Sequence, residues 1–318
     1  MNDISNINFL ELWTEYDKFM KIKLKPQSYR KQAHLYKNNI VPYFKDYLIN
    51  DITVNIYIAW MLKMEENGYK FSYLKGLHQA MVGILNHAVK FYNLSENIAS
   101  KIGCFKRKKS ERKNVDFWTL EEFTKFISVV DDDLYKLLFN VLYFSGLRIG
   151  ECLALTWNDF DNGCIEISKT IAKEKDKDGN YIINSPKTES SYRKITLDSQ
   201  ITKKLNSYYK KEKKKESFDN SWFIFGGIKP LAQTTVTRKK DKYCQLANVK
   251  KIRLHDFRHS HATLLLSNGI PITVISQRLG HSDIAMTLNT YSHLVNKDEE
   301  KAIEFINLIK QNNSHLFN

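Results

Sequence analysis

A polar and strongly basic stretch at residues 101–114, KIGCFKRKKSERKN, divides the sequence into two parts. It shows no hydrophobic periodicity, so it offers no apolar face that could join a core. The chain has 318 residues, which is enough for a separate core on each side of such a break. We therefore expect one domain over residues 1–105, a basic linker over 106–115 and a second domain over 116–318.

The N-terminal part has the hydrophobic spacing of helices and lacks the alternation of strands. In FLELWTEYDKFMKI, which begins at Phe9, apolar side chains recur at helical intervals. A long basic segment follows over 27–48, and two more helical patterns occupy 53–68 and 71–93. This spacing predicts a compact helical bundle.

The C-terminal part predicts a mixed fold. Thr119 and Glu122 have the spacing of a capping box, and the apolar helix that comes later breaks near Gly146 and restarts. Three short strands are predicted next, over 164–171, 181–188 and 193–197. The sequence DKDGN supplies a hairpin turn between the first two strands, and helices return from about residue 198. The expected fold class is mainly α, with a small antiparallel β-sheet in the second domain.

The charge balance points to a polyanionic partner. Lys and Arg number 49 against 35 Asp and Glu, so the formal net charge is +14. Nucleic acid is the first candidate and an anionic membrane surface is the second. No apolar run approaches membrane-spanning length, and the N-terminus has no signal-peptide pattern, so we expect no membrane association. The linker cations are expected to follow DNA phosphates, although a solvated loop has the same composition: Lys106, Arg107, Lys108, Lys109 and Arg112.

The cysteines give an indication of the redox compartment. They lie far apart, without a CxxC pair, at Cys104, Cys152, Cys164 and Cys244. This distribution is typical of free thiols in a reducing cytosol, so we expect a cytoplasmic protein.

Residues 253–262, RLHDFRHSHA, allow two interpretations. In the first, His255 and His259 lie on one helix face as zinc ligands, as in the HExxH motif of zinc proteases. Asp256 is then one methylene shorter than the usual base, and Arg258 would lie beside a dication. In the second, His255 and Arg258 direct two donors at one anion. The second interpretation is favoured because such short motifs often match by chance, and we expect no metal site.

Five further residues have the chemistry of a phosphate site. Arg148 follows a helix break, and Glu151 lies three residues later, where it can orient the guanidinium. Lys187 lies in a connection between predicted strands, where its ammonium could protonate a leaving oxygen. His281 follows a glycine helix stop, and Tyr291 comes ten residues later. Each of these residues, taken alone, is more often an ordinary surface or core residue.

Taken together and in order, the candidates resemble the catalytic residues of tyrosine recombinases of the phage integrase family: Arg148, Lys187, His255, Arg258, His281 and Tyr291. The resemblance runs through GLRIGE, SPKTESSYRKITL, LHDFRHSHAT and LGHSDIAMTLNTYSHL, and it covers residues 115–297. It implies a SAM-like core-binding domain over 1–105 and a catalytic domain over 116–318, which close on DNA as a C-shaped clamp. It also implies a bacterial cytoplasmic protein associated with the nucleoid.

The resemblance implies a reaction. Tyr291 would attack the scissile phosphate and leave a 3′-phosphotyrosine and a free 5′-hydroxyl. Arg148 and Arg258 would hold the non-bridging oxygens and stabilise the charge of the transition state. No metal, other cofactor or ATP is expected, because the arginines replace the cation and the phosphotyrosine stores the energy of the broken phosphodiester.

The resemblance implies roles for the remaining residues as well. His255 would take or share the tyrosine proton, and Lys187 would protonate the departing 5′-oxygen. His281 would donate a further hydrogen bond to the phosphate, and Glu151 would orient its neighbours.

The expected partners follow from the same resemblance. The substrate would be double-stranded DNA at attachment or transposon-end sites, and the protein would assemble on it as a homo-tetramer. A C-terminal helix is expected over 298–310, with Ala302, Phe305, Ile306 and Ile309 at i, i+3, i+4 and i+7. In the family such a helix typically packs against a neighbouring protomer. An excisionase and a host DNA-bending protein are further expected partners.

Alternatives stay open at this point. A chromosome-dimer resolving recombinase and a type IB topoisomerase-like enzyme share the chemistry, and a DNA-binding regulator could retain a relic of it. The extended segment TIAKEKDKDGNYIINSPKTESS and the residues within the motifs look more like those of integrases of phages and conjugative transposons. Those integrases usually carry a small N-terminal arm-binding domain. The expected first helix starts close to Met1, so we expect either a two-domain form or a protein from which that domain was removed.

Overall fold

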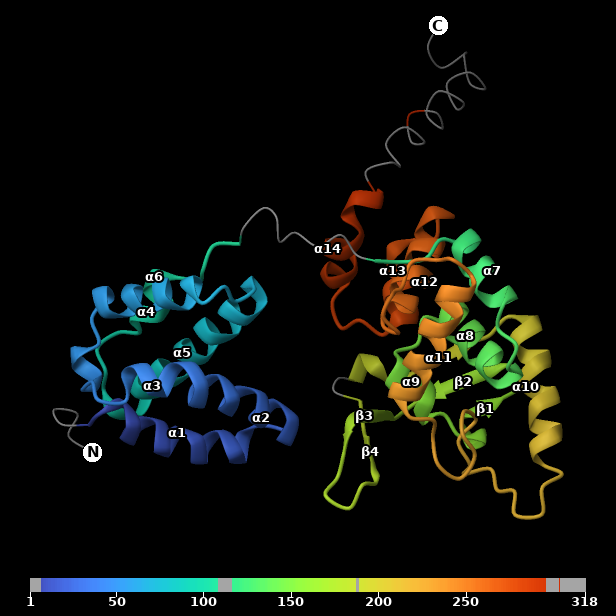
Figure 1. The fold of residues 1–318 in the computed structure, drawn as a ribbon, viewed down its shortest axis with the longest axis horizontal. Helices are drawn as coiled ribbons and strands as arrows, with labels where there is room; N and C mark the ends of the chain where they lie inside the picture. The colour runs from blue at the N-terminus through green and yellow to red at the C-terminus, as the bar shows by residue number, and fades with distance from the viewer. Residues whose placement is uncertain (1–6, 108–115, 187–188, 296–302, 304–318) are drawn as a thin grey trace, which may run out of the picture. The chain divides into compact units, whose positions relative to one another are not determined.

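The computed structural model describes residues 7–107, 116–186, 189–295 and 303. The chain divides into two compact units, unit 1 over Met1–Asn114 and unit 2 over Val115–Asn318 (Figure 1). The division therefore follows the last residue of the basic stretch. Some predicted features lie outside the described residues, namely Lys108, Lys109, Arg112, Lys187 and, apart from Ile303, the segment 298–310.

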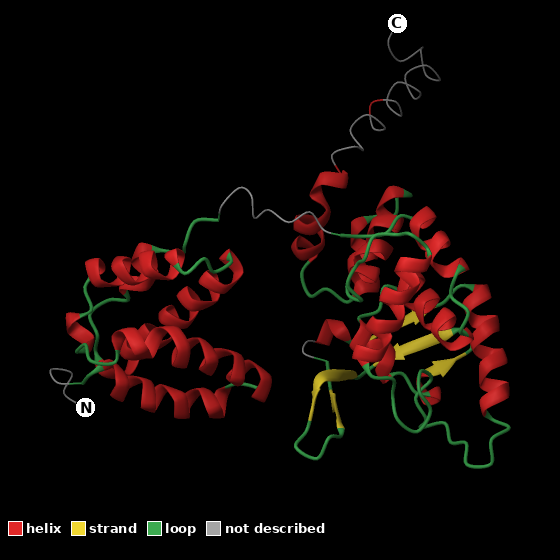
Figure 2. Ribbon diagram, viewed as in Figure 1, coloured by secondary structure: helices red, strands yellow, loops and turns green. Residues whose placement is uncertain are grey.

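Residues 7–107 of unit 1 form helices and connecting loops, as the sequence predicts (Figure 2). The α-helices are α1 (Phe9–Lys23), α2 (Pro26–Leu35), α3 (Val41–Phe44), α4 (Val54–Glu66), α5 (Phe71–Tyr92) and α6 (Ile98–Ile102), and a π-helical turn joins α2 to α3 over Tyr36–Ile40. Asn8 and Thr53 begin α1 and α4, because their side chains accept hydrogen bonds from backbone amides of the first turn.

Helix α5 provides the centre of the unit 1 core. Its residues Leu77, Met81, Ile84 and Ala88 recur at helical spacing and are fully buried. The helix packs against α1 and α2, and it ends at Asn93, which adopts the left-handed conformation with φ 53°.

Unit 2 combines helices with short strands. The helices are α7 (Leu120–Ser128), α8 (Asp133–Ser145), α9 (Ile149–Ala154), α10 (Ser199–Glu212), α11 (Gln233–Leu246), α12 (Asp256–Ser267), α13 (Ile272–Leu279) and α14 (Ile284–Val295). The strands are β1 (Phe160–Asp161), β2 (Cys164–Ile167), β3 (Thr170–Lys175), β4 (Tyr181–Asn184) and β5 (Arg193–Thr196). The predicted capping box of Thr119 and Glu122 is present at the start of α7.

The strands form two antiparallel sheets, not one (Figure 2). One sheet has the order β1-β2-β5, and the hairpin of β3 and β4 forms the other. A single strand over 164–171 was therefore a wrong prediction, because β2 ends at Ile167 and β3 begins at Thr170. Between them the Lys169 ammonium lies 2.8 Å from the Asp159 carboxylate, and this ion pair holds the chain where it changes sheets.

Glycine at position 150 places the β3–β4 hairpin against α9. A Cβ there would lie 2.6 Å from Thr170 Oγ1 and 2.8 Å from the Ile171 carbonyl oxygen. A larger residue would push the hairpin away from α9. The predicted DKDGN turn closes the hairpin, with the Asn180 carbonyl accepting from the Asp176 amide at 3.0 Å.

An aromatic cluster joins α7, α8 and α12 in the core of unit 2. Phe123 stacks on Tyr143 with 3.8 Å between ring centroids, and Phe257 stacks on Phe139 at 5.8 Å. Phe257 is fully buried and directly precedes Arg258, so the core sets the position of that arginine.

Two general predictions can be compared with the described residues. The four cysteines are free thiols, as their spacing indicates. Within those residues no helix combines the length and the apolar character needed to cross a membrane.

Candidate active site

Arg148 is held at the turn between α8 and α9. Helix α8 ends at Gly146 in the left-handed conformation, φ 68°, where a Cβ would lie 2.5 Å from the His261 ring. The Arg148 amide donates to Glu151 Oε2 at 3.0 Å, and Arg148 Nη1 donates to Glu151 Oε1 at 2.8 Å. The contact expected between these two residues is therefore present, and about a third of the Arg148 side chain, 34%, stays exposed.

Glu151 also binds Arg193, which lies in the segment SPKTESSYRKITL but was not among the predicted site residues. Arg193 Nη2 on β5 donates to Glu151 Oε2 at 2.8 Å, and its Nε donates to the Arg278 carbonyl at 2.9 Å. Burial raises the pKa of the Glu151 carboxyl, but the hydrogen bonds and charges of Arg193 and Arg148 outweigh burial and hold the pKa below its usual value. The carboxylate is therefore ionised and shared between two arginines.

Arg258 is a buried cation with one unused donor. Only 2% of the residue is exposed, and its Nη1 donates to the Gly146 carbonyl at 3.1 Å. Nη2 is buried and has no hydrogen-bond partner among the described residues. Burial, with the nearby charge of Arg148, lowers the pKa of this guanidinium. A buried cation with an unsatisfied N–H favours the binding of an anion at this point.

The zinc interpretation of residues 253–262 does not suit this geometry. Asp256 is fully buried, and its carboxylate accepts hydrogen bonds from the Arg253 amide, Nε and Nη2 at 2.7 to 3.1 Å. It is therefore engaged and not positioned as a base. The Nδ1 of His259 is hydrogen-bonded to Tyr291, and across the described ranges no three His, Cys, Asp or Glu side chains gather as a metal site.

His255 and His281 lie in the electrostatic field of the arginines. His255 directly precedes α12, and burial together with His259, Arg258 and Arg148 lowers its pKa to about 4. His281 follows the left-handed Gly280, and its Nδ1 lies 2.7 Å from Thr287 Oγ1 on α14. Burial and the charges of Arg258 and Arg148 lower the pKa of His281 to about 4. Both imidazoles are therefore neutral at pH 7 in the absence of an anion.

Tyr291 on α14 lies in the same cluster. The residue is 2% exposed, and its hydroxyl lies 2.7 Å from His259 Nδ1 on α12. Burial raises the pKa of the hydroxyl, while the charge of Arg258 acts in the opposite direction. The structure thus brings together five of the predicted residues, Arg148, His255, Arg258, His281 and Tyr291, whereas Lys187 lies outside the described residues.

The two described linker cations belong to unit 1. Lys106 and Arg107 are both exposed, and the Arg107 guanidinium lies 5.8 Å from the centre of the Phe71 ring.

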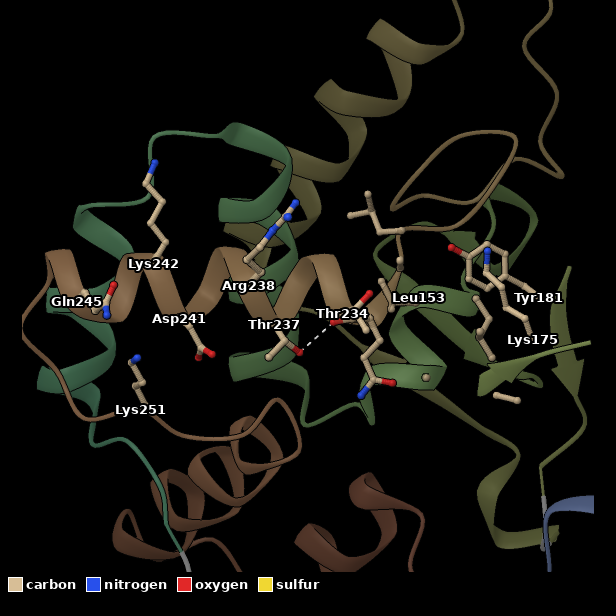
Figure 3. Close-up of a pocket in the computed structure, with 16 residues that line it drawn as sticks. Leu153, Lys175, Tyr181, Thr234, Thr237, Arg238, Asp241, Lys242, Gln245 and Lys251 are labelled. Atoms are coloured by element: carbon tan, nitrogen blue, oxygen red, sulfur yellow. Dashed lines mark hydrogen bonds between the residues drawn. The ribbon is translucent and has the colours of Figure 1, made fainter. Parts of the chain in front are cut away.

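A groove in unit 2 was not predicted from the sequence. Its volume is about 860 Å³, and it lies between α11 and the β3–β4 hairpin (Figure 3). Helix α11 contributes Thr234, Thr237, Arg238, Lys242 and Gln245, and the hairpin contributes Lys175 and Tyr181. Figure 3 shows Arg238 and Lys242 projecting from the same side of α11. The signal in the sequence was the polar run QTTVTRKKDK within a helix, which leaves one long face without an apolar stripe.

The cluster has the components of a phosphoryl-transfer site with a tyrosine nucleophile. It combines a buried guanidinium with an unused donor, a second guanidinium, neutral imidazoles and a buried phenol. The chain matches the profile of the Phage integrase family over residues 116–298 and that of the Phage integrase N-terminal SAM-like domain over residues 8–64. The chain belongs to the phage integrase family and is a tyrosine recombinase, an enzyme that breaks and rejoins DNA.

Comparisons with individual proteins give the same assignment. The chain is 31% identical over 316 residues to the ICEBs1 integrase of Bacillus subtilis (strain 168), covering 96% of this chain and 84% of that protein. Its fold is similar to that of the Tn1549 transposon integrase in complex with transposon right end DNA, with a TM-score of 0.76 and 20% identity over 93% of this chain and 99% of the other. It is also similar to a lambda integrase tetramer bound to a Holliday junction, with a TM-score of 0.63 and 16% identity over 89% and 80%. The protein is a site-specific recombinase of the kind that mobile elements use as integrases.

Proposed function

We propose that Tyr291 is the nucleophile of DNA cleavage and forms a 3′-phosphotyrosine with the end of a mobile element. The observation that carries this proposal is the unused Nη2 of Arg258, buried in the same cluster as the Tyr291 hydroxyl. A phosphodiester satisfies that donor and neutralises the buried charge. Attack by Tyr291 breaks the bond to the 5′-oxygen, and attack by another strand's 5′-hydroxyl reverses the step, so one DNA joint is exchanged for another.

The surrounding residues have separate roles in this proposal. Arg148 and Arg258 hold the two non-bridging oxygens, and Glu151 keeps the Arg148 guanidinium in place. His255 and His281 are neutral at rest and become hydrogen-bond partners of the phosphate and its reacting groups. Lys187 protonates the 5′-oxygen. The two guanidiniums supply the positive charge, so the reaction requires no metal, other cofactor or ATP.

Double-stranded DNA contacts the chain at more than the cleavage site. Residues 1–105 form a core-binding domain, residues 106–115 a basic linker and residues 116–318 a catalytic domain, and both domains bind the duplex. The α11 groove suits contacts with phosphates and base edges. One face of α11 carries Arg238, Lys242 and amide and hydroxyl groups there. The Tn1549 integrase, whose fold this chain shares, was solved on transposon-end DNA, which supports this arrangement.

Strand exchange needs paired cleavage sites, so the active assembly is a tetramer. We place this assembly in the bacterial cytoplasm. The lambda integrase, which has a similar fold, forms a tetramer on a Holliday junction. The segment 298–310 docks as a helix on a neighbouring copy and couples the protomers, because its apolar positions require a partner surface. An excisionase and a DNA-bending protein bias the direction of the reaction.

A suicide substrate tests the nucleophile. It is a duplex from the element's own ends, nicked so that the short fragment carrying the new 5′-hydroxyl diffuses away and the covalent adduct accumulates. The wild-type chain gives a slowly migrating adduct on a denaturing gel. Tyr291→Phe binds the duplex in a gel shift but gives no adduct.

Tyr192→Phe is the matched control, because Tyr192 is 51% exposed and lies outside the cluster. It should give the adduct at the wild-type level. A normal adduct yield with Tyr291→Phe overturns the assignment, and Tyr243 is then the next tyrosine to test.

A further inference from the structure

The hydroxyl of Tyr291 has a direct hydrogen-bond partner that the resemblance did not identify. That partner is His259, whose Nδ1 lies 2.7 Å from the hydroxyl oxygen. His259 follows Arg258 on α12, and the two rings meet at a centroid distance of 5.9 Å. The sequence alone suggested His259 only as a zinc ligand, and the family resemblance assigned the tyrosine proton to His255.

We propose that His259 is the base that removes the proton from Tyr291 when the phosphate is attacked. This inference rests on the proposed role of Tyr291 as the nucleophile. His255 lies farther back, with its ring centroid 5.2 Å from that of His259 in an edge-on contact. The structure thus forms a chain of contacts from Tyr291 to His259 to His255, in which His259 touches the reacting oxygen.

The protonation states at rest suit this role. Burial raises the pKa of Tyr291, so the phenol is protonated at neutral pH and must lose its proton to attack. Burial also lowers the pKa of His259; Asp256 opposes this, and Arg253 and Arg258 add to it. The imidazole is therefore neutral, with Nδ1 free to accept the phenol proton when Nε2 carries the ring hydrogen.

Binding of DNA raises the proton affinity of His259 when Tyr291 must lose its proton. The charge of Arg258 acts on both the phenol and the imidazole. A phosphodiester bound between Arg258 and Arg148 offsets that charge and raises the proton affinity of His259. Proton removal is then coupled to substrate binding, and the tyrosine stays protonated when no phosphate is bound.

The step balances in atoms and charge. The Tyr291 oxygen forms a bond to phosphorus, the bond from phosphorus to the 5′-oxygen breaks, and the phenol proton moves to His259 Nδ1. The 5′-oxygen takes a proton from the acid assigned to Lys187. In the rejoining step the incoming 5′-hydroxyl returns its proton to Lys187 and attacks phosphorus, the bond from phosphorus to the Tyr291 oxygen breaks, and the imidazolium of His259 returns its proton to that oxygen.

Packing within one chain sets the positions of His259 and Tyr291 relative to each other. Helices α12 and α14 pack against each other and against α13, so His259 and Tyr291 are held by the same three-helix arrangement. The aromatic core around Phe257 fixes the start of α12. The proposed nucleophile, the proposed base and Arg258 therefore lie together within one chain.

The test varies the acidity of the nucleophile. Tyr291 is replaced by 3-fluorotyrosine and by 3,5-difluorotyrosine, which are progressively more acidic and need a base progressively less. Each is combined with His259→Asn, which keeps a hydrogen-bond acceptor near the Nδ1 position but cannot take a proton at neutral pH. His255→Asn is the matched control. Single-turnover adduct formation on the suicide substrate is the readout.

With tyrosine at 291, His259→Asn should slow adduct formation on the order of a hundredfold, the usual scale for general base catalysis. The loss should shrink with each added fluorine, whereas the loss caused by His255→Asn should stay constant across the series. Thermal unfolding checks that the variants are folded, and His259→Gln replaces His259→Asn if the latter is not.

Three results would overturn the inference in distinguishable ways. A His259→Asn loss that is the same for all three phenols shows that His259 only positions the tyrosine. A His255→Asn loss that shrinks with fluorination identifies His255 as the base. If the wild-type chain forms no adduct, or Tyr291→Phe forms one normally, the proposed function has failed, and this inference fails with it.

Discussion

Replacing Glu151 with glutamine should destabilise unit 2 by about 3 kcal/mol at pH 7, the lower end of the range for breaking a buried ion pair. The Glu151 side chain is 6% exposed, and each of its oxygens accepts a hydrogen bond from an arginine at 2.8 Å. Arg193 is 7% exposed and would remain as a buried cation whose partner has lost its charge. The glutamine oxygen keeps one acceptor, so the loss should not reach the upper end of that range.

The dependence on pH gives the prediction a second, independent part. The folded-state pKa of Glu151 is held below its usual value, so its contribution is fully present above the unfolded-state pKa and is lost as pH falls through the folded-state pKa. The stability difference between wild type and Glu151→Gln should therefore be constant above about pH 5, given an unperturbed Glu pKa of about 4.3. It should shrink below that, as the wild-type carboxyl becomes protonated.

Urea unfolding followed by ¹⁹F signals of 5-fluorotryptophan measures this difference for unit 2 alone, through Trp118, Trp157 and Trp222. Glu121→Gln is the matched control. Glu121 forms an ion pair with Lys125 in which both side chains are more than half exposed, so its loss should cost less than about 1 kcal/mol. The reasoning is refuted if Glu151→Gln costs no more than the control, or if its effect is unchanged between pH 7 and pH 3.

Three further predictions concern the reaction. Lys187→Ala should slow cleavage on the order of a hundredfold while DNA binding persists, and a 5′-bridging sulfur substrate, which needs no acid, should recover most of the rate; no recovery would make Lys187 a binding residue. Cleavage should continue in excess chelator without added magnesium or zinc, whereas loss with chelator and recovery with zinc would restore the zinc interpretation of residues 253–262. Removing residues 298–318 should leave single-site DNA binding nearly intact but impair synapsis and strand exchange, and recombination at the full-length rate would show that this segment does not couple protomers.

Local patterns in the sequence determined most elements and most of the candidate site. The helical spacing of residues 9–22 and 71–93, the capping box at Thr119 and the glycine stops follow from interactions within one turn of helix, so they can be predicted without a fold. The contact of Arg148 with Glu151 has the same origin, because three residues separate the two positions.

Tertiary structure decided what depends on residues far apart in the sequence. The local pattern of residues 164–171 predicts one strand. Its division into two sheets follows from long-range partners, because β2 pairs with β5 while β3 packs beside Gly150. Arg193 and Arg148 both bind Glu151. Because 42 positions separate Arg193 from Glu151, no local spacing predicts that contact.

The chemistry of the site depends on such long-range contacts in the same way. The unused donor of Arg258 appears only when folding removes water from a guanidinium whose other nitrogen binds Gly146, 112 positions away. His259 meets Tyr291 across 32 positions, because α12 and α14 pack against each other. The sequence by itself determined which chemical groups this protein carries. Packing and burial decided which of them are charged, which have hydrogen-bond partners and which one contacts the Tyr291 hydroxyl.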